Sequence, residues 1–324
     1  MPLQYPFRRI GVLFTSLAFV SLGEAASFDC AKAHLPFERA VCADPKVSAA
    51  DTLLAQRYSK AMSQLSDAGK HIVQDGQRQW LRYVRILCTG HTNDATRCLK
   101  DAYDARLNDL KLAAVRVGPY VFSRIDFYAA ADPDEHGVLS KGQIAVPRID
   151  SPITSLTMEW NKVMARIYAS RPHSAGCDGP SGDYAFDYKI GGVTRTSISI
   201  VTNDWMYCHG AAHGYGSSKS ITYVTQPELH PLAATDLFRS DINWTAFLVK
   251  RCALKIQEDS GTTSLDPKAI VEAVRAPESW AVSSEGLVIT IDTLEVGAGP
   301  GIVKVAFSWA DLQPFLTAAA TSMF

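Results

Sequence analysis

The chain has 324 residues, of which 47% are hydrophobic and 20% are charged, and its formal net charge is −1. This composition is typical of a globular protein with enough apolar residues for one large or two modest cores. The near-zero charge excludes a strongly basic nucleic-acid-binding protein as the default class, so we expect no nucleic-acid partner.

The N-terminus has the pattern of an export signal. Arg8 and Arg9 precede an uncharged apolar run, and Gly23 and Ala25 are the small residues that favour cleavage after Ala25. The run is too short to span a bilayer. We therefore predict a signal peptide over residues 1–25 and a mature protein without a membrane span, located in the periplasm or secreted.

Helical periodicity dominates the next part of the chain. Apolar residues recur three or four positions apart in LLAQRYSKAMSQL and again in WLRYVRIL, which is the spacing of one helix face. Ser48 and Asp94 are typical N-cap residues ahead of two helical segments. We predict an all-α domain over 26–112, built as a bundle of three or four short helices.

The pattern changes after Gly118-Pro119 to β-rich runs. YAFDYKI and VTRTSISIV flank Gly191-Gly192 and predict a hairpin that turns at these glycines. SITYVT, GLVITIDTLEV and GIVKVAFS predict further strands, whereas INWTAFLVKRCALKIQ and the closing WADLQPFLTAAATSMF predict helices. We expect an α+β domain with an antiparallel sheet over 113–324.

Cysteines are frequent for a chain with an export signal. An oxidising compartment favours disulfides over thiolate metal ligands. We expect two bridges in the helical part, with all three pairings open, and one bridge plus one free thiol in the second part. The cysteines concerned are Cys30, Cys42, Cys88, Cys98, Cys177, Cys208 and Cys252.

The stretch CHGAAHGYG places His209 and His213 four residues apart, a spacing that suits zinc on a helix. Its glycines oppose a helix, however, and a tight turn is the better interpretation. No further His, Asp or Glu stands at convincing zinc spacing, so we predict no metal and no cofactor. His213 is expected to hold the turn by hydrogen bonds, and Cys208 to form a disulfide.

Aromatic and acidic residues surround this turn in the sequence. The aromatic side chains either form a recognition surface, since aromatics are efficient hot spots, or fill the core beneath the hairpin. Residues 26–112 contain 13 Lys and Arg against 10 Asp and Glu, whereas 113–324 contain 17 against 22, so a cationic partner should prefer the second part. The candidate partner-binding residues are Asp204, Trp205, Tyr207, His213, Tyr215, Glu228 and Asp236.

Catalytic motifs are missing from the sequence. It contains no G-x-S-x-G elbow, no H-E-x-x-H, no S-x-x-K and no P-loop. Asp204 and His213 near Ser217 do not make a triad by sequence proximity alone. We therefore predict that the protein is not an enzyme.

Several motifs of the helical part resemble the LprI-type lysozyme inhibitor domain of exported bacterial proteins. They are SFDCAKAHLPFERAVC, the L-x-x-x-Y segment LAQRY, QRQWL and the ending CLKDAYDARLNDL. The resemblance implies a disulfide-linked helical fold and a lysozyme partner. The residues that stand in the family's places, besides the first four cysteines, are Tyr58, Trp80, Tyr103 and Arg106.

The second part resembles, more loosely, the extracellular domain of RsiV-type anti-sigma factors. The matching elements are the turn at Gly210-Ala211-Ala212-His213, LAATDLF, and the closing GLVITIDTLEVGAGPGIVKVAFSWADLQPFL. In RsiV such a domain binds lysozyme, so both resemblances imply the same class of partner.

We therefore expect an exported two-domain protein that sequesters or inhibits a lysozyme-type muramidase. A loop or an acidic edge would occlude the substrate cleft of the enzyme, and binding should weaken with salt. The alternative is a non-catalytic module that binds peptidoglycan or another part of the cell envelope.

Overall fold

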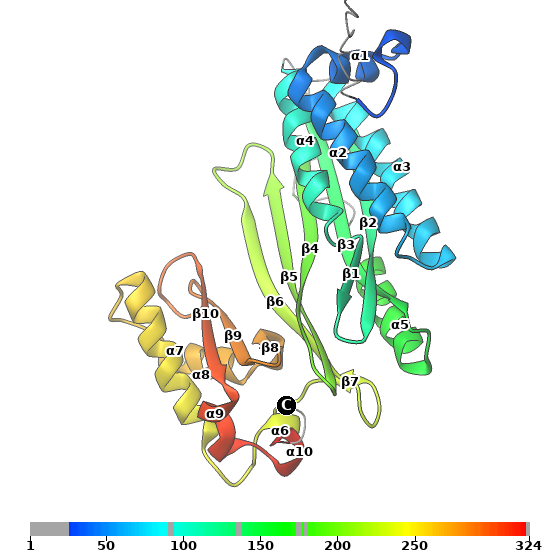
Figure 1. The fold of residues 1–324 in the computed structure, drawn as a ribbon. Coiled ribbons are helices and arrows are strands. Elements are labelled where there is room, and N and C mark those ends of the chain that lie inside the picture. Colours follow the sequence, from blue (N-terminus) through cyan, green and yellow to red (C-terminus); the bar gives the residue numbers. More distant parts are fainter. Residues whose placement is uncertain (1–25, 90–93, 134–137, 173–176, 178–180, 322–324) are drawn as a thin grey trace, which may run out of the picture.

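The computed structural model describes residues 26–89, 94–133, 138–172, 177 and 181–321, and Figure 1 shows their arrangement. The predicted signal peptide lies outside these residues. Within the described ranges, every helix is either too short or too polar to cross a bilayer.

Four helices form the N-terminal part, as the apolar spacing predicted. After a short 3-10 turn, η1 (Cys30–Lys32), they are α1 (Pro36–Ala43), α2 (Pro45–Met62), α3 (Asp67–Thr89) and α4 (Ala95–Asp109). Their buried side chains form one core, in which the rings of Trp80 and Tyr103 meet edge to face with centroids 5.2 Å apart.

One helix start was predicted wrongly. Asp44, and not Ser48, caps α2, because its side chain accepts hydrogen bonds from the backbone N–H groups of Lys46 and Val47. Pro45 occupies the first helical position, where its missing N–H costs no hydrogen bond. Ser48 is buried and donates its hydroxyl to the carbonyl of Val41 at 2.8 Å.

Three disulfides tie the chain. Cys30–Cys42 joins η1 to α1, and Cys88–Cys98 joins the end of α3 to the start of α4. Of the three pairings that the sequence left open, the structure thus has the one that joins cysteines adjacent in the sequence. Cys177–Cys208 anchors the end of a strand, and Cys252 is a buried free thiol.

Cys252 is expected to be inert in the native protein and to react once the chain unfolds. Burial raises the pKa of its thiol to about 12, so almost no thiolate exists near neutral pH. Titration with Ellman's reagent at pH 8 should detect no thiol in the native, non-reduced protein and one per chain in guanidinium. Three thiols in guanidinium would contradict the three bridges.

A seven-stranded sheet follows the helices, with its strands in sequential order. The strands are β1 (Ala114–Val117), β2 (Tyr120–Pro133), β3 (Leu139–Ser151), β4 (Gly182–Val193), β5 (Ser197–Cys208), β6 (Tyr215–Val224) and β7 (His230–Pro231). The predicted antiparallel strands are present, but the sheet as a whole is mixed, because β3 and β4 run parallel. Helix α5 (Ser155–Ala169) links them, and a helical crossover returns the chain in the same direction.

The hairpin of β4 and β5 is present, but its turn lies three residues beyond the predicted glycines. Gly191 and Gly192 belong to β4, where the register with β5 shifts. A Cβ on Gly192 would lie 2.5 Å from the carbonyl oxygen of Val282. Glycine at this position therefore permits the close approach of a neighbouring strand and does not make the turn.

The two faces of the large sheet are covered by different helices. Ile144 of β3 packs with Trp160 of α5 in one core. Its neighbour Gln143 points to the opposite face, where it donates to the Tyr83 hydroxyl of α3 at 2.9 Å. Helices α3 and α4 therefore cover the face that α5 leaves free.

The C-terminal part is a smaller unit with its own core. Strands β8 (Trp280–Val282), β9 (Gly286–Asp292) and β10 (Ile302–Ser308) form an antiparallel sheet. It packs with α7 (Trp244–Ser260) and α8 (Pro267–Arg275). Short helical segments complete the unit, namely α6 (Ala234–Leu237), η2 (Pro277–Ser279), α9 (Trp309–Leu312), η3 (Gln313–Phe315) and α10 (Ala318–Thr321).

The single closing helix predicted for WADLQPFLTAAATSMF is wrong over the described residues. Pro314 lacks a backbone N–H and lies in η3, where the α-helical pattern stops. The next segment is extended, and Leu316 forms an isolated β-bridge with Phe238.

Candidate functional site

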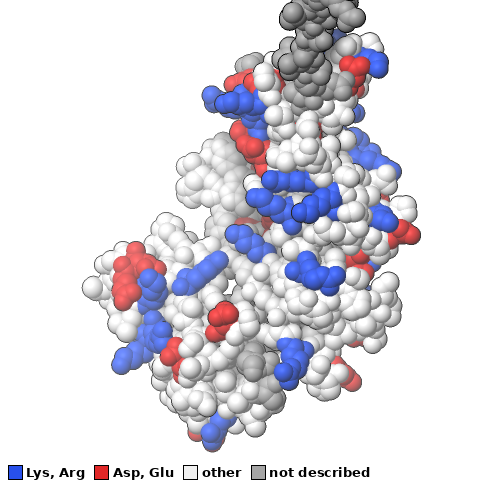
Figure 2. Space-filling model, in the orientation of Figure 1, with Lys and Arg blue, Asp and Glu red and all other residues white. Residues whose placement is uncertain are grey.

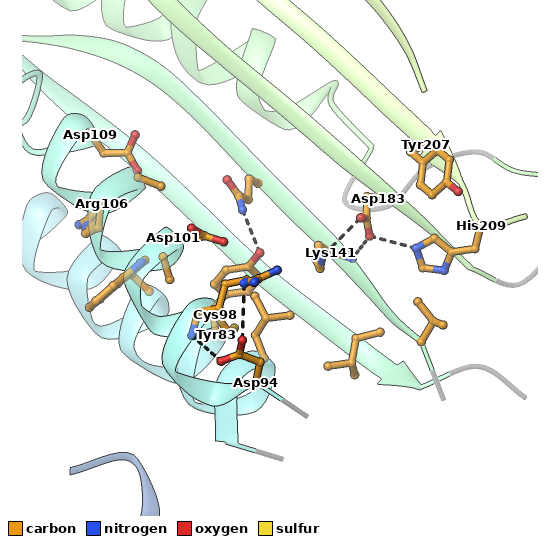
Figure 3. Close-up of a pocket in the computed structure, with 18 residues that line it drawn as sticks. Tyr83, Asp94, Cys98, Asp101, Arg106, Asp109, Lys141, Asp183, Tyr207 and His209 are labelled. Atoms are coloured by element: carbon orange, nitrogen blue, oxygen red, sulfur yellow. Dashed lines mark hydrogen bonds and ion pairs between the residues drawn. The ribbon is translucent and has the colours of Figure 1, made fainter. Parts of the chain in front are cut away.

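A cleft of about 720 Å³ opens between α4 and the large sheet. Helices α3 and α4 supply one wall, and β3, β4 and the end of β5 supply the other (Figure 3). Apolar side chains such as Leu87, Ala102 and Leu139 alternate with charged ones along these walls. The volume lies in the range of natural ligand sites, so the cleft is wide enough for a side chain or a short segment of a partner.

Arg106 joins α4 to the sheet at the inner end of this cleft. Only 1% of its surface is exposed. Its guanidinium donates to Asp126 at 2.7 Å, to the Tyr128 hydroxyl at 3.0 Å and to Gln77 at 3.0 Å. The residue therefore serves as a buried connection between the helices and β2.

The buried charges continue beneath Arg106. Arg124 pairs with Asp126, with Asp187 at 2.7 Å and with Asp109 at 3.3 Å. The Tyr128 hydroxyl donates to Asp109 at 2.6 Å. Burial raises the pKa of Asp109 even though Arg124 lies beside it. Apart from Nη2 of Arg106, which has no hydrogen-bond partner among the described residues, these groups satisfy one another, and they hold the helices on the sheet.

On the sheet side, Asp183 contacts Lys141 and His209. Lys141 approaches it at 3.6 Å and donates its backbone N–H at 3.0 Å, and His209 Nε2 lies 3.2 Å away. Nearby, Tyr83 is buried, and burial raises its pKa to about 12, so it stays a neutral phenol at physiological pH. Among the described residues of this wall, the charge of Asp183 is thus offset by Lys141.

On the helix side, by contrast, one carboxylate has no cationic partner among the described residues. Asp94 caps α4 through the backbone N–H of Arg97 and pairs with the Arg97 side chain at 3.5 Å. Asp101 is exposed and has no ion-pair partner among the described residues. Figure 3 shows its carboxylate pointing away from α4 toward the side on which Lys141 and Asp183 lie.

An aromatic row leads out of the cleft along β5. Trp205 and Tyr207 of β5 and His209, which directly follows the strand, lie in a row, with successive ring centroids 6.2 Å and 5.9 Å apart. Tyr207 and His209 line the cleft, whereas Trp205 is 42% exposed near the β5–β6 turn. A Cβ on Gly214 would lie 2.7 Å from the indole nitrogen, so glycine there lets the turn pack on the ring.

The structure places the other candidates of the turn elsewhere. Asp204 points to the opposite face of β5, where Arg171 pairs with it at 3.2 Å. Tyr215 lies opposite Met206 on that same face and is 55% exposed. His213 is exposed in the turn, with Nδ1 3.1 Å from the Gly214 carbonyl oxygen. Only Trp205 and Tyr207 are therefore brought together.

Glu228 and Asp236 lie at the other end of the sheet. The ten residues of β6 separate them from the turn, a length of roughly 30 Å. Asp236 accepts from the backbone N–H of Ala233 at 2.8 Å, which caps α6, and lies 3.3 Å from His230. Nearness in the sequence was a poor guide here, because an extended strand carries the chain away.

Sequence reasoning missed the cleft itself. Asp101, Lys141 and Asp183 come from separate segments and carry no local motif, and His209 was considered only as a possible zinc ligand of the turn. As for the possibility of zinc at the turn, the described residues contain no group of three or more His, Cys, Asp or Glu side chains placed to hold a metal ion.

A family comparison bears on the helical part. The sequence model of the family described as "Lysozyme inhibitor LprI" matches residues 30–110. The match spans η1, α1, α2, α3 and α4, and it includes Asp94, Asp101 and Arg106. A search among curated proteins found no match.

Two solved structures resemble parts of the fold. One is a DUF3298 family protein from Pseudomonas aeruginosa PAO1, with 10% identity, a TM-score of 0.45 and coverage of 63% of this chain and 97% of that chain. The other is a DUF3298 member from Bacteroides fragilis NCTC 9343, with 11% identity, a TM-score of 0.41 and coverage of 64% and 97%. Both TM-scores are too low to establish a shared fold, and the RsiV-type resemblance of 113–324 stays a prediction.

Proposed function

We propose that this protein is exported and binds a lysozyme-type muramidase, which it inhibits by occluding the active-site cleft. The observation that carries the proposal is the match of residues 30–110 to a family of lysozyme inhibitors. The three disulfides are those of a protein that folds in an oxidising compartment, where such an enzyme would be met.

The β5–β6 turn is the element best suited to enter a substrate cleft. Figure 1 shows it standing clear of α4 and of the C-terminal unit. Among the described large hydrophobic side chains that are exposed, the aromatic ones are Trp205 and Tyr215, and both flank this turn. Exposed aromatic groups on a projecting hairpin can fill a groove without any chemistry.

Charge distribution would orient the partner. Figure 2 shows Lys and Arg side chains spread over the visible face of the helical part. Residues 113–324, which include the turn, carry 17 Lys and Arg against 22 Asp and Glu. A cationic muramidase would therefore be attracted to residues 113–324 more than to the helical part, and this attraction is screened by salt.

The test is an inhibition assay with the purified, oxidised chain lacking residues 1–25. We expect a cationic chicken-type lysozyme to lose activity at submicromolar inhibitor, and the inhibition constant to rise as salt is increased. Goose-type and invertebrate-type enzymes identify the class that is recognised. Full activity of all three classes at micromolar protein would contradict the proposal and favour an envelope-binding module.

A further inference from the structure

We propose that the cleft between α4 and the large sheet receives a basic side chain, a Lys or Arg, presented by the protein partner. The identity of the partner rests on the proposed function, whereas the chemistry of the ligand rests on the cleft alone. Three features of the cleft support this: its charge, its apolar walls and its continuity with the aromatic row.

Among the described residues that line the cleft, one carboxylate has no cationic partner. Asp94 is paired with Arg97, and Asp183 with Lys141 and His209. The charges at the inner end belong to the buried network described above. Asp101 thus lies at the cleft without a cation among the described residues, and it attracts a positive group to this side of the cleft.

The walls beside Asp101 fit a long aliphatic chain. Ala102 and Ala105 of α4 are small and leave room, and Val138 and Leu139 face the same cleft from the sheet side. A Lys or Arg side chain packs its methylene groups on such a surface while its charged head stays at the polar rim. A single free carboxylate is too few ligands for a divalent metal, and an anion would be repelled.

The cleft also continues the surface proposed to meet the enzyme. Tyr207 and His209 line the cleft and belong to the same aromatic row as the exposed Trp205. A partner seated on Trp205 therefore extends over the cleft mouth. This continuity favours a side chain of the bound protein over a free small molecule.

The first experiment tests, without lysozyme, whether the cleft recognises a cationic side chain. We would titrate the oxidised chain with the peptide acetyl-Ala-Lys-Ala-amide, and with a copy carrying norleucine in place of lysine, and follow backbone amide resonances by NMR. The lysine peptide should shift the amides of Ala102 and Lys141, and the norleucine peptide should not. Asp101→Asn should weaken binding about threefold to fivefold, as expected for a single exposed ion pair.

The matched control is Asp104→Asn. Asp104 is exposed on the same helix and carries the same charge, but it does not line the cleft. Its substitution should leave peptide binding unchanged. If both variants weaken peptide binding equally, the effect comes from the overall charge of the helix and not from a specific pair with Asp101. If the norleucine peptide binds as well as the lysine peptide, the cleft does not recognise a cation. Either result overturns the proposal.

The second experiment repeats the lysozyme assay with the wild type and both variants. Asp101→Asn should raise the inhibition constant by a similar factor, and Asp104→Asn should not. If the wild type inhibits no lysozyme, the proposed function fails while the peptide titration still decides the chemistry of the cleft. Peptide binding at Asp101 combined with an unchanged inhibition constant would overturn the assignment to this partner.

Discussion

Replacing Arg106 with methionine is expected to lower the free energy of unfolding by about 3–5 kcal/mol. The buried network holds Arg106 and Arg124 against Asp109, Asp126 and Asp187. The substitution leaves one guanidinium to face three carboxylates, and it removes hydrogen bonds in a region shielded from water. Urea unfolding of the oxidised chain, followed by far-UV circular dichroism, measures the loss.

Arg97→Met is the control for this experiment. Arg97 lies on the same helix, but its pair with Asp94 is exposed, so its loss should cost less than about 1 kcal/mol. Adding Asp126→Asn to the Arg106 variant should restore part of the stability, because it removes a buried carboxylate that has lost a partner. Equal stability of the Arg106 and Arg97 variants would show that the network does not hold the helices on the sheet.

Trp205→Ala is expected to raise the inhibition constant for the sensitive lysozyme by about thirtyfold or more, the effect of removing a hot spot worth about 2 kcal/mol. The indole is the most exposed ring of the aromatic row, and Gly214 packs against it. Because the ring lies at the surface, its loss should leave the urea midpoint nearly unchanged. The same assay as above, run beside an unfolding curve, separates binding from stability.

Ile153→Ala serves as the comparison for this second substitution. Ile153 is 72% exposed and precedes α5, far along the chain from the β5–β6 turn. The Ile153→Ala substitution removes exposed apolar surface but leaves the aromatic row intact, so inhibition should be retained. Undiminished inhibition by the Trp205 variant would exclude the turn as the occluding element and move the interface to another surface.

The helical part was predictable because its signals are local. Each helix carries its own apolar stripe, and Asp94 caps α4 as its sequence position indicated. The pairing of the cysteines required knowing which helix ends are neighbours, and sequence spacing alone left it open. In the structure the end of α3 lies next to the start of α4, so Cys88 and Cys98 are close enough to bond.

The mixed sheet was not predicted because α5 was overlooked. Its segment SLTMEWNKVMARIYA has helical spacing, and Thr154 caps it together with Thr157, so a signal was present. Strands β1, β2 and β3 were not predicted either, so the sequence offered no crossover between parallel strands. No comparable signal in the sequence indicated the cleft, because Asp101 and Asp183 line it together only when the helices pack on the sheet.

The position of Asp126 has a consequence for how this chain is divided. The matched family region ends at residue 110, yet the buried Arg106 near its end pairs with a carboxylate twenty residues further on, Asp126 in β2. A fragment cut between α4 and β1 would expose Arg106 to water and leave Asp126 with Arg124 as its partner. Transplanting the helical module into another protein therefore requires partners on the new scaffold in place of Asp126 and Tyr128, which both lie outside the matched region.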